Sequence, residues 1–116
     1  MALARWFTPE FRASNPNEVE RVVAILRAND PTAYTRSCSA ISMIDYRETN
    51  PSICCAALVI AGARDEATPP ALSDAIHASI PGSTLVSIDA AHISVAEKPA
   101  EFVSAVLSFL NQQHGK

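Results

Sequence analysis

The spacing of hydrophobic residues divides the chain into two halves. Up to residue 50 the spacing is helical, because apolar residues recur every three or four positions. The first such stripe consists of Val19, Val22, Val23 and Leu26. Asn15-Pro16 predicts the start of this helix, with Asn15 and Glu18 forming a capping box. Asp30-Pro31 predicts the start of a second helix. The positions expected to be buried on that helix and at its end are Tyr34, Cys38, Ile41 and Met43.

From residue 53 onwards the apolar residues occur in short continuous runs separated by polar loops. Residues 57–61 and 84–88 are each expected to form a strand buried on both faces of a parallel sheet. Pro69-Pro70 predicts a helix between the two strands, and Lys98-Pro99 predicts a last helix. The inward positions expected on the intervening helix are Leu72, Ile76 and Ile80. The second half is therefore expected to be β-α-β-α with a right-handed crossover.

Two parallel strands are too few to form a stable sheet by themselves. The free edge of residues 57–61 would expose backbone groups and apolar side chains to water, and the sequence contains no other convincing strand. The predicted fold class is therefore α/β, with further strands of the sheet missing from these residues. The chain is also expected to pair with a complementing N-terminal half or to self-associate through the open sheet edge.

Composition excludes several classes of partner. The net charge is −3 and the nine Lys and Arg residues are scattered, so no basic surface for nucleic acid is expected. The longest apolar run, residues 53–61, is too short to cross a bilayer. The three cysteines, Cys38, Cys54 and Cys55, neither form a disulfide framework nor match a zinc-binding pattern. They predict buried, reduced thiols in a cytoplasmic protein, with no metal.

Glycine content limits the chemistry further. Only three glycines occur, Gly62, Gly82 and Gly115, and none lies two residues from another. Every Gly-x-Gly and Gly-x-Ser-x-Gly motif is therefore absent, which excludes a phosphate loop, a dinucleotide fingerprint and a nucleophile elbow within these residues. No cofactor is expected. Ser94, Ser37 and Ser39 also lack the context of a nucleophile, since the first has no elbow and the other two fall in a predicted helix.

Chemistry is predicted at the loops that follow the two strands. Gly62-Ala63-Arg64-Asp65 follows the first strand, and Asp89-Ala90-Ala91-His92 follows the second. In open α/β sheets, functional sites form beyond the carboxyl ends of adjacent strands. Asp65 and His92 are therefore expected to meet there, so that the carboxylate fixes the imidazole tautomer. The order Asp then His also matches that of hydrolases whose serine lies earlier in the chain.

The residues around this pair carry a family resemblance. Residues 58–70 resemble the acid-bearing segment of α/β-hydrolases, and residues 80–99 resemble their histidine segment. Residues 5–11, followed by Asn15-Pro16, look like the end of the cap domain in 3-oxoadipate enol-lactone hydrolases. The resemblance divides the chain into a helical end of the cap domain, residues 1–50, and the C-terminal β-α-β-α of the hydrolase core, residues 51–116.

The resemblance implies Asp65 as the acid and His92 as the general base of a catalytic triad. It implies a small anionic lactone as substrate, with Arg5 and Trp6 as substrate-binding residues, although packing of cap against core explains these two equally well. It also implies that the nucleophilic serine and the oxyanion donors belong to an N-terminal region. The expectation is therefore a C-terminal portion of a carboxylic-ester hydrolase, inactive by itself. Two alternatives stay open: a portion of an α/β-hydrolase of other specificity, and a non-catalytic remnant or binding module.

Overall fold

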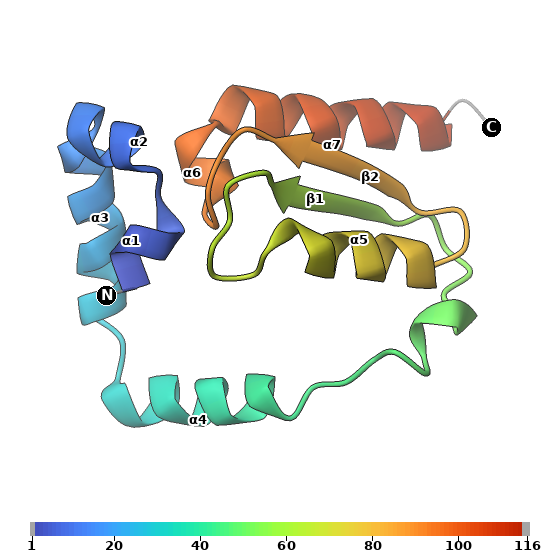
Figure 1. Ribbon diagram of the computed structural model, residues 1–116, viewed down its shortest axis with the longest axis horizontal. Helices are drawn as coiled ribbons and strands as arrows, with labels where there is room; N and C mark the ends of the chain where they lie inside the picture. The colour runs from blue at the N-terminus through green and yellow to red at the C-terminus, as the bar shows by residue number, and fades with distance from the viewer. Residues whose placement is uncertain (1, 115–116) are drawn as a thin grey trace.

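The computed structural model describes residues 2–114, and its two halves differ in architecture (Figure 1). The helices of the first half are α1 (Ala2–Trp6), α2 (Pro9–Ser14), α3 (Pro16–Arg27) and α4 (Pro31–Ser42). The second half consists of η1 (Asn50–Ser52), β1 (Leu58–Gly62), α5 (Pro70–Ser79), β2 (Thr84–Ile88), α6 (Ser94–Glu97) and α7 (Pro99–His114). The predicted strands and the four longer helices are confirmed. The three short helices α1, α2 and α6 were not predicted, because each is too short to show a helical period.

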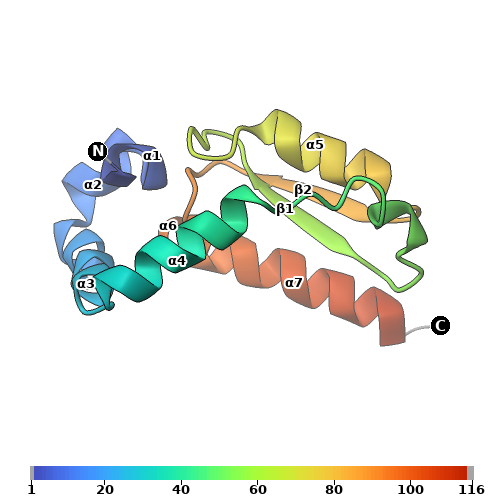
Figure 2. The same cartoon turned by 90° about the horizontal axis from the view of Figure 1, so that it is seen from below.

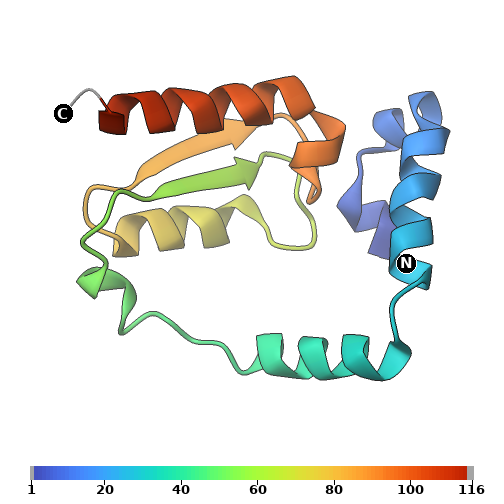
Figure 3. The same ribbon diagram turned by 180° about the vertical axis from the view of Figure 1, so that it is seen from behind.

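The sheet is parallel, as predicted. β1 pairs with β2 in a register that runs from Leu58 opposite Thr84 to Gly62 opposite Ile88. α5 and α7 lie on opposite faces of this sheet (Figure 2). Both strands end on the side of the molecule where α1, α2 and α3 lie, so the loops that follow the strands face the N-terminal helices (Figures 1 and 3).

Phe7, in the turn between α1 and α2, is fully buried. Its ring stacks on that of Phe11, with 5.4 Å between the ring centroids. Thr8 caps α2, because its hydroxyl oxygen accepts a hydrogen bond from the backbone N–H of Phe11 at 3.3 Å. The predicted stripe on α3 faces inward, with Val23 buried. The capping box expected at the start of α3 is wrong: the side chain of Asn15 makes no capping bond, and the carboxylate of Glu18 instead pairs with Arg21.

The burial expected around α4 is also wrong. Every residue of α4 is exposed, and Met43 just beyond it is 84% exposed rather than core. The predicted inward residues Tyr34, Cys38 and Ile41 face water for the same reason: within residues 2–114 no element covers this helix. Cys54 and Cys55 are exposed as well, so the expectation of buried thiols fails for all three cysteines.

The second half is only partly covered. Leu72 and Ile76 of α5, predicted to point inward, are exposed, whereas Ile80 is buried as expected. β1 is half-buried over its first three residues and buried at its last two, so burial on both faces is reached only near its carboxyl end. Each strand has one neighbour in this two-stranded sheet, and its other edge has no partner within residues 2–114. The best-packed part of the sheet is therefore the end where the predicted site lies.

Candidate active site

The loops that follow β1 and β2 are joined by backbone hydrogen bonds beyond the end of the sheet. The N–H of Ala63 donates to the carbonyl of Ile88 at 2.8 Å, and the N–H of Arg64 donates to that of Ala90 at 3.0 Å. The pairing of the strands thus continues into the loops and brings Asp65 beside the segment that carries His92. The sequence-based expectation that these two residues meet is matched by a distance of 2.8 Å between His92 Nδ1 and Asp65 Oδ2.

The close approach of these loops depends on Gly62. A Cβ atom at this position would overlap the carbonyl oxygen of Ala91 and would lie 2.8 Å from that of Ala90. Both obstacles are backbone atoms, which cannot rotate aside as a side chain can. Glycine therefore lets the segment before His92 pass directly over the end of β1.

Both oxygens of the Asp65 carboxylate are fully occupied. Oδ1 accepts from the backbone N–H groups of Ala67 at 2.7 Å and Thr68 at 2.9 Å. Oδ2 accepts from the hydroxyl of Thr68 at 2.7 Å and lies 2.8 Å from His92 Nδ1. The residue is buried, with 8% of its surface exposed. These contacts fix the position of the carboxylate without any further side chain.

The same contacts determine the ionisation of Asp65. Burial raises the pKa of the carboxyl group, but the hydrogen bonds from His92, Thr68 and Ala67 lower it more, so the pKa lies below its ordinary value of 3.8. The ionised carboxylate can only accept hydrogen bonds, so Nδ1 of His92 carries the proton and Nε2 is left as the acceptor. His92 is partly open to solvent, its side chain being 37% exposed. The arrangement can therefore accept a proton at Nε2 while Asp65 stabilises the resulting imidazolium.

The segment that carries the two predicted substrate-binding residues is hydrogen-bonded to the residue after His92. Arg5 and Trp6 form the end of α1, and the carbonyl of Trp6 accepts a hydrogen bond from the N–H of Ile93 at 3.0 Å. The residue that follows His92 is therefore bound to the N-terminal segment. Arg5 is exposed and Trp6 is half-buried.

The serines discounted as nucleophiles differ in their surroundings. Ser37 and Ser39 lie on α4, where their hydroxyl groups donate to backbone carbonyls four residues earlier in the helix. Ser94 is buried at the start of α6. Within residues 2–114 no group of three or more His, Cys, Asp or Glu side chains is arranged to bind a metal ion. In the same residues, no helix has both the length and the apolar character needed to cross a membrane.

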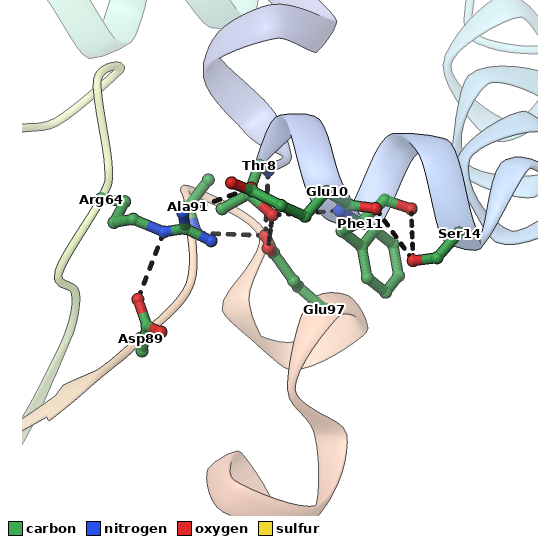
Figure 4. Close-up of polar contacts among 8 residues, drawn as sticks. All are labelled: Thr8, Glu10, Phe11, Ser14, Arg64, Asp89, Ala91 and Glu97. Atoms are coloured by element: carbon green, nitrogen blue, oxygen red, sulfur yellow. Dashed lines mark hydrogen bonds and ion pairs between the residues drawn. The ribbon is translucent and has the colours of Figure 1, made fainter.

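A second set of polar contacts surrounds Glu97, at the end of α6 (Figure 4). Glu97 is 6% exposed, and its carboxyl group joins Thr8 to Ala91, the residue before His92. Nearby, Arg64 pairs with Glu10 of α2 and with Asp89, each at 3.2 Å. These contacts border a cleft of about 870 Å³ between α2, α3 and α6, which neither Asp65 nor His92 lines.

Sequence reasoning missed three of these residues. Thr68 had a usable signal, since Asp followed three residues later by Thr is typical of a side-chain-capped turn. Thr8, just before Pro9, fits a helix cap. Glu97 had no local signal, because its partner Thr8 lies 89 residues away in the chain.

Two solved structures of longer chains contain the same fold. The structure matches the enol-lactonase of Burkholderia xenovorans with a TM-score of 0.92 and 34% identity, over 95% of this chain and 42% of that one. It matches a hydrolase of Pseudomonas aeruginosa with a TM-score of 0.88 and 38% identity, over 94% of this chain and 41% of that one. The chain has the fold of the C-terminal portion of an α/β-hydrolase.

The curated relatives narrow the resemblance within this class. The chain is 37% identical to 3-oxoadipate enol-lactonase 2 of Acinetobacter baylyi over 105 residues, and 29% identical to enol-lactonase 1 of the same organism over 106. Over nearly its whole length it resembles enol-lactonases. It spans only about 40% of the length of these curated relatives. No family model matches the sequence.

Proposed function

We propose that Asp65 and His92 are the acid and the base of a serine-type carboxylic-ester hydrolase. The observation that carries this proposal is the 2.8 Å contact between the buried Asp65 carboxylate and His92 Nδ1 at the carboxyl ends of two adjacent parallel strands. His92 Nε2 takes the proton of a serine hydroxyl as that oxygen attacks the ester carbonyl, and then gives it to the leaving oxygen. In the second half of the cycle it activates the water that hydrolyses the acyl-enzyme.

The proposed substrate is 3-oxoadipate enol-lactone, which the relatives of Acinetobacter baylyi carry in their names. Hydrolysis opens the lactone ring and releases 3-oxoadipate after the enol reverts to a ketone. Arg5 and Trp6 are proposed to meet the substrate carboxylate and ring, since a guanidinium pairs with a carboxylate in a two-pronged contact. Support for this assignment comes from the hydrogen bond between the Trp6 carbonyl, at the end of α1, and the N–H of Ile93, the residue that follows His92.

We further propose that residues 1–50 act as the end of a cap domain and residues 51–116 as the end of the hydrolase core. The nucleophilic serine and its oxyanion donors come from residues outside these 116, in the same polypeptide or in a second one. The two unpaired strand edges within residues 2–114 support this, because parallel strands of this kind need neighbours on both sides. The 116 residues alone are then inactive.

A fusion protein tests this proposal. The C-terminal 40% or so of enol-lactonase 2 of Acinetobacter baylyi, the part that this chain matches, is replaced by this chain. The fusion is expected to hydrolyse 3-oxoadipate enol-lactone, and His92→Ala or Asp65→Ala is expected to abolish the activity. The 116-residue chain is assayed alongside on the lactone and on p-nitrophenyl acetate, with no turnover expected.

Three outcomes would contradict the proposal: a folded but inactive fusion, activity that survives His92→Ala, or turnover by the 116 residues alone. A set of aryl esters and lactones assayed with the same fusion separates enol-lactone hydrolysis from a general esterase. The enol-lactone is expected to give the highest kcat/KM.

A further inference from the structure

Glu97 is a buried acidic residue for which the proposed hydrolysis has no chemical role. Its Oε2 accepts from the backbone N–H of Thr8 at 3.3 Å and from that of Ala91 at 3.1 Å, while its Oε1 accepts from the hydroxyl of Thr8. Thr8 and Ala91 are themselves buried, at 4% and 3% exposed. A carboxyl group at such a position costs free energy unless its oxygens are hydrogen-bonded, and here both are.

The position of Ala91 gives this contact its importance. Ala91 directly precedes His92, and its N–H is held by Glu97. Ile93 directly follows His92, and its N–H is held by the carbonyl of Trp6 at 3.0 Å. The backbone N–H groups of both residues next to His92 are therefore tied to residues 6–8, that of Ile93 directly and that of Ala91 through Glu97.

We propose that Glu97 is a positioning residue for His92. Its carboxyl group binds the loop that carries His92 to the N-terminal segment at Thr8. This inference rests on the proposed role of His92 as the base. In consequence, residues 6–8 and the loop carrying His92 behave as one rigid unit. Loss of the Glu97 contacts frees the loop on the side of Ala91 and weakens the hydrogen bond between His92 and Asp65.

A second link joins the same elements but contributes little. Arg64 connects Glu10 of α2 to Asp89, again between the N-terminal helices and the loops beyond the strands. Its side chain is 43% exposed, and those of Glu10 and Asp89 are 71% and 74% exposed. Exposed ion pairs are screened by water and contribute little to stability. Arg64 is therefore a matched control for Glu97, because it also joins the N-terminal helices to the loops beyond the strands, but through exposed side chains.

The experiment uses the fusion protein described above, labelled with ¹⁵N, and needs no substrate. The first readout is the His92 Nδ1–H signal in the proton NMR spectrum. The second is hydrogen exchange at the Ala91 amide. Glu97→Ala and Thr8→Val are expected to remove or broaden the His92 signal. Glu97→Ala is also expected to speed exchange at Ala91 by about 10- to 100-fold, the range for loss of a hydrogen bond to a charged group.

Glu97→Gln is expected to retain the signal, since its amide can accept from the two N–H groups and donate to the Thr8 hydroxyl. Arg64→Ala is expected to leave both readouts unchanged, and so is Val106→Ala, which truncates a half-buried residue of α7 far from Glu97 in the chain. The proposal is overturned if Glu97→Ala and Thr8→Val keep the wild-type signal, if Glu97→Gln loses it, or if either control loses it. Should Glu97→Ala fail to fold, Thr8→Val decides in the same way. An inactive fusion protein would overturn the proposed hydrolase and leave these readouts unaffected.

Discussion

His92 Nδ1 lies 2.8 Å from Oδ2 of Asp65, although 27 residues separate the two in sequence. The Thr68 hydroxyl is shared between them: it donates to Asp65 Oδ2 at 2.7 Å and lies 3.2 Å from His92 Nδ1. The contact therefore has three members rather than two. Its immediate effect is electrostatic, because the bonds from His92 and Thr68 to Oδ2 stabilise the ionised form of this buried carboxyl group.

The pKa of Asp65 is accordingly expected to rise when a partner is removed. His92→Ala and Thr68→Val each delete a hydrogen bond to Oδ2 while burial, which raises the pKa, remains. Titration of the Asp65 carboxyl carbon by ¹³C NMR measures this directly. His77→Ala is the matched control, because His77 binds Ser83 instead. A midpoint that stays in place in both Thr68→Val and His92→Ala would show that these bonds do not set the pKa.

The lowered pKa also predicts how stability depends on pH. The folded-state pKa of Asp65 is below its unfolded value, so its contribution is fully present above pH 3.8, the ordinary value. It is lost as the pH falls through the folded-state pKa. Asp65→Asn is therefore expected to destabilise the chain at pH 6 and to have a smaller effect at pH 2.5. Urea unfolding of both proteins at the two pH values gives the comparison; an equal loss at both would contradict it.

Two glycines are expected to resist substitution for different reasons. Gly62→Ala forces a Cβ against the carbonyl oxygens of Ala90 and Ala91, and should cost about 1–3 kcal/mol or more, as overpacking does. Gly82 has open space around it but a φ of +70°, so Gly82→Ala should cost about 1–2 kcal/mol through backbone strain alone.

Asparagine separates these two causes, since it tolerates positive φ better than alanine does. Gly82→Asn should be milder than Gly82→Ala, whereas Gly62→Asn should be at least as damaging as Gly62→Ala. Urea unfolding of the four variants measures the losses. The Gly62 variants should also disturb the His92 Nδ1–H signal, and the Gly82 variants should not. If asparagine were milder than alanine at Gly62 as well as at Gly82, the steric explanation for Gly62 would be contradicted.

Local patterns predicted most of the framework of this site. A continuous apolar run ending at Gly62 predicts β1, and the rule that sites lie beyond strand ends predicts that Asp65 lies near His92. The contact between Glu97 and Thr8 has no local sequence pattern, because it forms only when the start of α2 packs against the end of α6. Exposure of α4 was also unpredictable, since periodicity shows which residues share a helix face but not what covers that face.

Arg5 offers a test of substrate recognition that is separate from the chemistry. In the fusion protein, Arg5→Ala is expected to raise KM for the anionic lactone by roughly 10-fold or more, the loss expected for a charge-assisted pair. Its kcat should change little if the contact is equal in the ground and transition states. Neutral p-nitrophenyl acetate serves as the control substrate, and its KM should not change. A parallel rise for both substrates would indicate that Arg5 only packs the cap against the core.

The uncovered apolar side chains predict how the 116 residues behave in solution. Leu72 and Ile76 of α5 are 53% and 45% exposed, and two unpaired strand edges lie within the described part of the sheet. Apolar surface of this kind drives association, so the chain is expected to form oligomers at micromolar concentration, detected by sedimentation velocity.

Replacing both exposed side chains, Leu72→Lys with Ile76→Lys, should shift the distribution of oligomers towards monomer. Ala71→Lys with Ala75→Lys adds the same charge at the same spacing on the same helix, at exposed small residues, and should shift it less. Equal shifts would assign the effect to charge repulsion, and a monomeric wild-type chain with a cooperative thermal transition would contradict the expectation outright.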